Sequence, residues 1–475
     1  MSFKFISLIG GLTSTILLSA CGDGSNFSAA PPTAAAPTAA PPTAAAPFVF
    51  SATTAANGTE LWTTDGTAAG TVLLKDIRAG AGDSNPFRFT LFNGAVYFEA
   101  TVAGVSGAEL WKSDGTAAGT VLVKDINPGS VDSFPSGFTV FNGALYFSAN
   151  DGTNGTELWK TDGTTAGTAM VKNIHAGALD SAPQSLTVFN GALYFQASDG
   201  TSGTELWKTD GTDAGTVLVK DIFAGGSNSD PNDLTAFGGS LYFSARDANG
   251  AELWKTDGTA AGTVLVKDIF AGASSSLPSG FTAFGNALYF KAADGINGIE
   301  LWKTDGTAAG TVLVKDINTN GIDDSNPGGF IVMNNVLYFR AIDSVNGSEL
   351  WKTDGTAAGT VLVQNINGGS ADSFPQNFTL FNGALFFRAT SASSGFELWK
   401  TDGTAAGTVI VKDIIAGATA SVSPARFVVV NGVLYFRASD GINGSEVWKT
   451  DGTAAGTVMV KDINSGVTGS DPFFE

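Results

Sequence analysis

The stretch that decides the fold is Glu157-Leu158-Trp159-Lys160-Thr161-Asp162-Gly163-Thr164, because close copies of it recur along the chain. Every tryptophan of the protein lies in one copy, between a Glu-Leu or Glu-Val pair and an Asp-Gly-Thr sequence. The nine tryptophans occupy positions 62, 111, 159, 207, 254, 302, 351, 399 and 448. The nearly constant spacing between these tryptophans is typical of proteins built from stacked structural repeats.

Within one period, short runs of strand-forming residues alternate with turn sequences. Asn142-Gly143 joins two such runs and is the strongest short hairpin signal. A third strand is expected at 156–161 and a fourth at 168–174, on either side of the Asp-Gly-Thr turn. Four antiparallel strands in a repeat of this length predict a blade of a β-propeller. The consecutive apolar residues Leu145-Tyr146-Phe147 agree, because a blade is buried on both faces.

Nine repeats predict an all-β fold, a single β-propeller of about nine four-stranded blades over residues 48–475. The repeat region begins with Phe48-Val49-Phe50-Ser51-Ala52, which matches a second strand, and it ends at 470–475, which matches the start of a first strand. The C-terminal segment is therefore expected to pair with the first blade and close the ring, which removes an exposed sheet edge. Two alternatives remain, a β-solenoid and an eight-bladed ring that leaves one blade unpartnered.

The repeated sequence resembles that of bacterial proteins with ELWxxDGT repeats, over roughly residues 48 to 475. This resemblance implies a propeller-like repeat fold and export from the cell. It supplies no catalytic residues.

The first twenty residues have the features of an export signal. Lys4 precedes an apolar run that is too short to span a membrane, and small residues follow the run. Leu18-Ser19-Ala20-Cys21 resembles the lipobox of bacterial lipoproteins, which implies cleavage of residues 1–20 and a lipid anchor, with palmitate, on Cys21. Gly22 rather than Asp after the cysteine favours the outer membrane of a Gram-negative envelope, with a periplasmic or cell-surface location.

Residues 21–47 comprise the predicted lipidated cysteine and a segment rich in Ala, Pro and Thr. Such a composition cannot bury enough apolar surface to offset its ordering entropy, and its prolines favour extended geometry. The segment is expected to be a disordered tether between a membrane and the propeller.

The chain carries 44 acidic and 25 basic residues, with a net charge of −19. This balance disfavours nucleic acid as a partner. Cys21 is the only cysteine, so core packing rather than an intrachain disulfide must hold the fold. We expect a monomer.

Three residues of the repeated motif are constant. The tryptophan is expected to pack between blades, and the Asp of Asp-Gly-Thr to form an Asx-type turn. The constant Glu precedes Leu-Trp in a buried strand and needs partners, which could be turn N–H groups or a lysine such as Lys172. Alternatively, Asp151, Asn154 and Glu157 could bind calcium through oxygen ligands, although other repeats lack part of this set. No other cofactor is expected.

The turns between second and third strands and the connections between blades share one face of the predicted disc. Their sequences vary from repeat to repeat, whereas the turns on the opposite face have nearly the same sequence in every repeat. Loops on a rigid scaffold commonly carry function, so the variable face is the predicted binding face.

One strand position also changes character around the ring. The residue after Tyr-Phe in the second strand is basic only in the last four repeats, at Lys291, Arg340, Arg388 and Arg437. These residues could pair locally with the constant Glu or stack on a tryptophan. The alternative hypothesis is a ligand-binding groove that recognises carboxylate or phosphate groups on a polymer.

The sequence favours a binding module over an enzyme. His175 is the only histidine, and neither a phosphate-binding loop nor a long insertion that could build a cleft is present. We expect a membrane-tethered cell-envelope module that recognises a polysaccharide or an envelope protein. An envelope-assembly scaffold and a carboxylate-based hydrolase or lyase are the alternatives.

Overall fold

The computed structural model describes residues 48–102, 106–320, 322–415, 417 and 423–474. The predicted signal peptide, Cys21 and the tether lie outside these residues. Within the described part, no helix has the length and apolar character that a membrane crossing requires.

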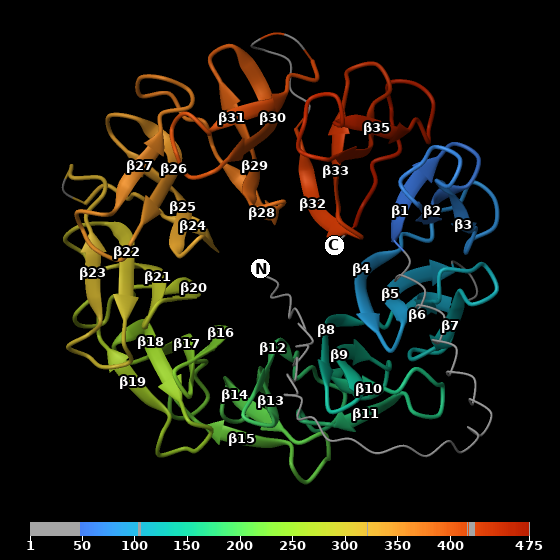
Figure 1. Ribbon diagram of the computed structural model, residues 1–475. Coiled ribbons are helices and arrows are strands. Elements are labelled where there is room, and N and C mark those ends of the chain that lie inside the picture. The colour runs from blue at the N-terminus through green and yellow to red at the C-terminus, as the bar shows by residue number, and fades with distance from the viewer. Residues whose placement is uncertain (1–47, 103–105, 321, 416, 418–422, 475) are drawn as a thin grey trace, which may run out of the picture. The chain divides into compact units, whose positions relative to one another are not determined.

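The described strands form nine antiparallel sheets arranged in a ring (Figure 1). Eight sheets have four strands, and the first sheet has three strands to which a C-terminal segment is added. The prediction of a nine-bladed propeller is confirmed. We number the blades from one, which contains β1–β3, to nine, which contains β32–β35.

The strands occupy four positions from the centre of the ring outward. The inner strands are β4 (Phe87–Phe92), β8 (Ser136–Phe141), β12 (Gln184–Phe189), β16 (Asn232–Phe237), β20 (Ser279–Phe284), β24 (Gly328–Met333), β28 (Gln376–Phe381) and β32 (Ala425–Val430). The second strands are β1 (Val49–Thr54), β5 (Ala95–Val102), β9 (Ala144–Asn150), β13 (Ala192–Ser198), β17 (Ser240–Asp247), β21 (Ala287–Ala293), β25 (Val336–Asp343), β29 (Ala384–Ser391) and β33 (Val433–Ser439). The third strands are β2 (Gly58–Thr63), β6 (Ser106–Ser113), β10 (Thr156–Thr161), β14 (Thr204–Thr209), β18 (Gly250–Thr256), β22 (Ile299–Thr304), β26 (Gly347–Thr353), β30 (Ser394–Thr401) and β34 (Ser445–Thr450). The outer strands are β3 (Val72–Lys75), β7 (Val121–Lys124), β11 (Ala169–Lys172), β15 (Val217–Lys220), β19 (Val264–Lys267), β23 (Val312–Lys315), β27 (Val361–Gln364), β31 (Val409–Lys412) and β35 (Val458–Lys461).

The outer strand is shorter than the sequence suggests. A strand was predicted at 168–174, but β11 ends at Lys172. The reason is that the chain turns after this residue, so that the N–H of Ile174 donates to the carboxylate of Glu157 at 2.8 Å instead of to a neighbouring strand.

The core lies between the blades. Leu145, Phe147 and Trp159 of blade three pack against Tyr97 and Leu110 of blade two, and this cluster has a counterpart at each of the other blade interfaces. Burying one such side chain contributes roughly 1.5–3 kcal/mol. The predicted packing role of the tryptophans is confirmed.

Lysines tie each blade to the next. Lys160 Nζ donates to the carbonyl of Gly211 at 2.8 Å, and Lys124 Nζ donates to that of Thr168 at 2.8 Å while lying over the ring of Trp159. The same ties cross from blade nine to blade one, where Lys449 bonds to Gly66 and Lys461 to Thr71. Much of the basic charge of the protein is therefore used inside the fold.

Residues 470–474, the closing segment, complete blade one. Ser51 and Phe473 exchange two backbone hydrogen bonds of 3.0 and 2.9 Å, and Thr53 N donates to the carbonyl of Ser470 at 2.8 Å. Phe474 is buried against the rings of Phe48 and Phe50. The predicted closure of the ring by the C-terminal segment is confirmed.

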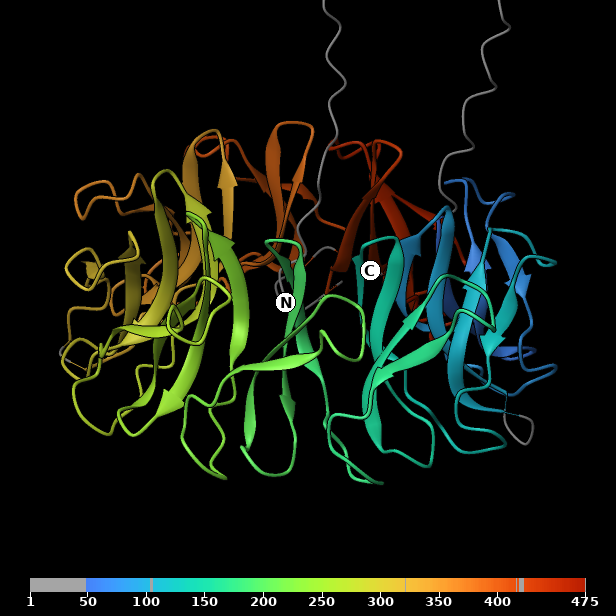
Figure 2. The ribbon, with the colours of Figure 1, turned by 90° about the horizontal axis from the view of Figure 1, so that it is seen from below.

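The loops lie on two opposite faces of the ring (Figure 2). The hairpin face carries the turns between first and second strands and the Asp-Gly-Thr turns. The connection face carries the turns between second and third strands and the blade-to-blade connections, which bond to one another through pairs such as Ser181 N and Thr156 O. The inner strands surround the axis of the ring, which we call the central channel (Figure 1). Some of their side chains, such as Leu91 and Leu380, are exposed.

Candidate functional site

The constant Asp of Asp-Gly-Thr has a structural role. Asp162 Oδ1 accepts hydrogen bonds from Thr164 N at 2.8 Å and from Thr164 Oγ1 at 2.7 Å, and these bonds lower the pKa of the carboxyl group. A side chain at Gly163 would collide with the hydroxyl of Tyr97 in the previous blade, because an added Cβ would lie 2.2 Å from that oxygen. The predicted Asx-type turn is confirmed.

The constant Glu is satisfied by the loop that follows the outer strand. Glu157 is fully buried and accepts from Ile174 N at 2.8 Å, from Ser181 Oγ at 2.6 Å and from His175 N at 3.2 Å. The serine lies 24 residues after the Glu and recurs at nearly the same spacing, a signal that the sequence analysis missed. The lysine alternative is wrong, since Lys172 bonds to Thr216 O and Asp213 of the next blade.

The calcium alternative finds no support in the geometry. Asp151 Oδ1 accepts from Thr153 N and Asn154 N, and its second oxygen accepts from Asn154 Nδ2. Asn154 Oδ1 in turn accepts from Asn173 Nδ2, and Glu157 is occupied by its own loop. Among the described residues, no three His, Cys, Asp or Glu side chains are grouped so that they could hold a metal ion.

Burial dominates the acidity of the constant Glu residues. It raises the pKa of five of them to about 7, although hydrogen bonds from loop N–H groups and serines act in the opposite direction. These five residues are Glu109, Glu300, Glu349, Glu397 and Glu446.

We expect the propeller to be less stable at pH 8 than at pH 5. A folded-state pKa above the ordinary value of 4.5 means that the folded protein binds protons more tightly, so this contribution to stability is lost as the pH rises through about 7. The pKa values of the Asp-Gly-Thr carboxyl groups are lowered, so their contribution to stability is lost only as the pH falls below about 4. Thermal unfolding followed by circular dichroism between pH 5 and 8 tests this. Glu109→Gln should flatten the slope, and a midpoint that rises with pH would contradict the expectation.

The structure places the four predicted ligand-binding residues at equivalent points of consecutive blades. Lys291 lies on β21, Arg340 on β25, Arg388 on β29 and Arg437 on β33, and all four are half-buried. We call them the basic arc. Lys291 Nζ donates to Asn326 Oδ1 in the connection of the next blade at 3.0 Å. The basic arc therefore faces the next blade, close to the connection face.

Other side chains at this position have partners within the chain. Glu99 forms an ion pair with Arg88, Ser148 bonds to Ser136 at 2.9 Å, and Gln196 donates to Gln184 at 3.1 Å. The fold thus readily supplies a partner for an acidic or neutral polar group here.

Within the described part of the chain, the arginines of the basic arc form no ion pair. The ion pairs Arg88–Glu99 and Lys172–Asp213 do not involve the arc. The buried Nε atoms of Arg340 and Arg388 have no hydrogen-bond acceptor among the described residues. Desolvation lowers the pKa of Arg388, whose guanidinium lies 4.6 Å from the ring centroid of Phe396. A half-buried cation without a counter-charge is costly, so this position is suited to an anion.

The variable residue after each outer strand mainly braces its own connection. Asn127 Nδ2 donates to Asp132 O at 3.1 Å, and His175 Nδ1 lies 3.1 Å from Asp180 O. Phe270 instead packs against the turn at Gly295. Part of the sequence variation in the blade-to-blade connections therefore reflects different ways to hold one loop.

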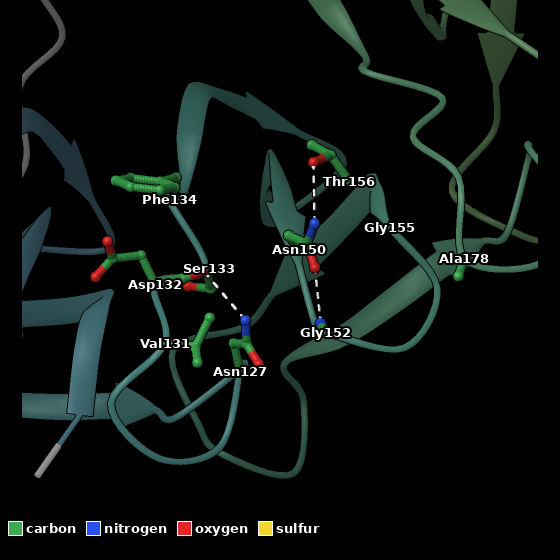
Figure 3. Close-up of a pocket in the computed structure, with 10 residues that line it drawn as sticks. All are labelled: Asn127, Val131, Asp132, Ser133, Phe134, Asn150, Gly152, Gly155, Thr156 and Ala178. Carbon is green, nitrogen blue, oxygen red and sulfur yellow. Dashed lines mark hydrogen bonds between the residues drawn. The ribbon is translucent and has the colours of Figure 1, made fainter.

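A shallow pocket of about 330 Å³ opens on the connection face between two such loops (Figure 3). Val131, Phe134 and Ala178 contribute to its lining. The polar residues around it bond to one another, as in the contacts of Asn150 with Thr156 and Gly152. A second pocket, of about 440 Å³, lies among the constant turns of the hairpin face. The charged side chains of the second pocket have structural partners, since Lys160 Nζ donates to the carbonyl of Gly211 and the carboxylates of Asp162 and Asp210 accept from the N–H groups of Thr164 and Thr212.

The similarity between this chain and known proteins is low. No protein-family model and no curated protein sequence matches the chain, so the resemblance to ELWxxDGT proteins stays a prediction. The chain is similar to the solved structure of a prolyl endopeptidase, with 13% identity and a TM-score of 0.41 over 76% of this chain and 55% of that one. For oligopeptidase B from Leishmania major the identity is 12% and the TM-score 0.42, over 78% of this chain and 54% of that one. For puromycin hydrolase the identity is 15% and the TM-score 0.38, over 75% of this chain and 58% of that one. The chain thus spans little more than half the length of these proteins, and identities at this level carry no statement about activity.

Proposed function

We propose that the protein is a ligand-binding module of the cell envelope, and that the basic arc binds carboxylate or phosphate groups of a polymer. The observation that carries this proposal is the set of half-buried guanidinium groups at Arg340, Arg388 and Arg437, which form no ion pair with any acidic residue that the structure describes. In a chain with a net charge of −19, such a concentration of unneutralised positive charge is unexpected unless an external anion completes it.

The position of the arc supports the proposal. Its members pair across the sheet with Ser279, Gly328, Gln376 and Ala425, which are the first residues of their inner strands. These inner strands begin at the connection face. A polymer lying along the rim of the channel on that face would meet four blades in succession, and repeated weak contacts would add up.

The loops of the connection face also carry exposed apolar side chains. Ten large apolar residues are exposed there, namely Val131, Phe134, Leu179, Leu277, Ile296, Ile322, Val345, Phe374, Ile442 and Val467. Exposed apolar side chains are common at interaction surfaces, so these loops support the connection face as a binding face.

The proposed membrane anchor would be joined to the propeller through blade one. Phe48, where the described chain begins, directly precedes the second-strand position of this blade and therefore lies at the hairpin face. Export and the lipid anchor are parts of this proposal.

Binding of residues 48–475 to a uronic acid polymer tests the proposal, with neutral dextran as the control ligand. We expect salt-sensitive binding to the acidic polymer, because ionic contacts to exposed polymers are screened. Changing Lys291, Arg340, Arg388 and Arg437 together to Ser should weaken it at least tenfold, which corresponds to about 1.4 kcal/mol. Isothermal titration calorimetry at two salt concentrations provides the measurement.

Arg246→Ser is the matched control for Arg388→Ser, since each removes one positive charge and Arg246 is exposed on blade five. The control should leave affinity unchanged. The alternative is that Arg388 only pairs locally within the fold. Local pairing predicts that Arg388→Ser lowers the thermal stability of the protein, so thermal unfolding distinguishes the two hypotheses. Equal binding by the wild type and the fourfold variant would rule out the arc as the site.

A further inference from the structure

The inner-strand residue that pairs with the arc position varies systematically around the ring. From blade one to blade nine it is Phe473, Phe87, Ser136, Gln184, Asn232, Ser279, Gly328, Gln376 and Ala425. The two smallest members, Gly328 and Ala425, stand beside Arg340 and Arg437. The two largest are phenylalanines in the neighbouring blades one and two.

The small residues open the arc toward the channel. Directly paired residues of antiparallel strands project from the same face of the sheet, so the side chain at 328 would lie between Arg340 and the channel. An added Cβ at Gly328 would have no atom within 4 Å. The paired residue of the inner strand therefore places no side chain beside Arg340, and Ala425 places only a methyl group beside Arg437.

The aromatic pair lies next to this opening, where the ring closes. The rings of Phe473 and Phe87 are 4.3 Å apart between centroids, and the guanidinium of Arg426 lies 3.8 Å from the centroid of Phe473. Phe87 remains 38% exposed. Arg88, which is paired with Glu99, lies 5.3 Å from the ring of Phe87. An exposed aromatic side chain at the rim thus follows the basic arc within two blades.

We infer that the ligand is an acidic polysaccharide that runs along the channel rim, with carboxylates at the openings beside Arg340 and Arg437 and a sugar ring against Phe87. This inference rests on the proposed function and names its ligand class. Arginine is suited to bidentate carboxylate binding, and an exposed aromatic ring offers an apolar surface to the C–H face of a sugar. A polyphosphate chain would contact the basic side chains but would gain nothing from the aromatic ring of Phe87.

Substitutions copied from other blades test the two halves of the inference. Gly328→Phe together with Ala425→Phe places in blades seven and nine the residue that blades one and two already have, and should weaken binding of a uronic acid polymer at least tenfold by blocking the openings. Ser136→Phe is the matched control in blade three, where the paired residue is Ser148, and should leave binding unchanged.

Phe87→Ser copies blade three and tests the sugar contact. It should weaken binding of the uronic acid polymer several-fold and leave binding of inorganic polyphosphate unchanged. Thermal unfolding of each variant verifies that the ring is intact, and Phe87→Leu, which keeps apolar surface without an aromatic ring, should bind with intermediate affinity.

The outcomes separate this inference from the proposed function. If the fourfold Ser variant loses binding while the Gly328, Ala425 and Phe87 variants bind normally, the arc binds an anion but the channel-rim arrangement is wrong. If Phe87→Ser weakens polyphosphate and uronic acid polymer equally, or if polyglutamate competes as well as the uronic acid polymer, the assignment to a polysaccharide is wrong.

Discussion

Replacing Phe474 with Ala is expected to lower the free energy of unfolding by about 3–5 kcal/mol, the range for truncating a buried phenylalanine. Its side chain is 1% exposed and packs edge-on against Phe48 at 5.5 Å and Phe50 at 6.4 Å. The closing segment is held to β1 by only three backbone hydrogen bonds, those of Ser51 and Thr53. The N–H groups of Ser470 and Asp471 also donate to the carbonyl of Ser445 in blade nine, so the loss of Phe474 chiefly weakens the junction of the segment with β1.

Urea unfolding followed by tryptophan fluorescence measures the effect. Val467→Ala is the control, because this side chain lies in the same terminal stretch and is 78% exposed. The control should change stability by less than about 0.5 kcal/mol. A Phe474 variant as stable as the control would show that the ring does not need the closing segment, and we also expect the Phe474 variant to self-associate, since the edge of β1 would be open.

Glu205→Ala is the second substitution with a large expected effect, about 3–5 kcal/mol. The buried carboxylate of Glu205 accepts from Ile222 N at 2.8 Å, Ser229 Oγ at 2.6 Å and Ser229 N at 3.1 Å. Truncation would leave these donors buried without acceptors and would release the connection between blades four and five. The substitution disturbs one connection, but it should lower the stability of the whole propeller, because each blade packs against both of its neighbours.

Asp213→Ala gives the matched comparison for the loss of one carboxylate. Asp213 forms a surface ion pair with Lys172, and its side chain is 78% exposed, so its removal should cost less than about 1 kcal/mol. Ser229→Ala should fall between the two variants. Similar midpoints for the Glu205 and Asp213 variants in chemical denaturation would contradict the structural role assigned to the constant Glu.

The fold was predictable from the sequence because the signal is repeated nine times. Asn142-Gly143 and the alternation of strands and turns define a blade, and the match between 470–475 and the start of a first strand predicts how the ring closes. The end of β11 at Lys172 was not predictable, since it depends on a hydrogen bond from Ile174 to a side chain 17 residues earlier.

The candidate site was predictable only in part. The four basic residues were visible in the sequence because they break a repeat pattern. Whether each has a partner depends on which side chains the neighbouring blade brings near, as Asn326 does for Lys291. The contribution of Gly328 was hidden by an irregularity in the pairing of β24 with β25, where the register shifts between Gly328 and Ile331. Simple counting from the Asn-Asn turn at 334–335 would pair Arg340 with a different residue.

The way in which blade one is assembled has a consequence for biosynthesis. Its strands come from residues 49–75 and 470–474, the two ends of the propeller, so a nascent chain cannot form the finished ring until its last segment has been made. Until then, the unfinished assembly displays unpaired strand edges of the kind that chaperones and proteases act on. A prematurely terminated chain would lack this segment permanently and would stay exposed to quality control.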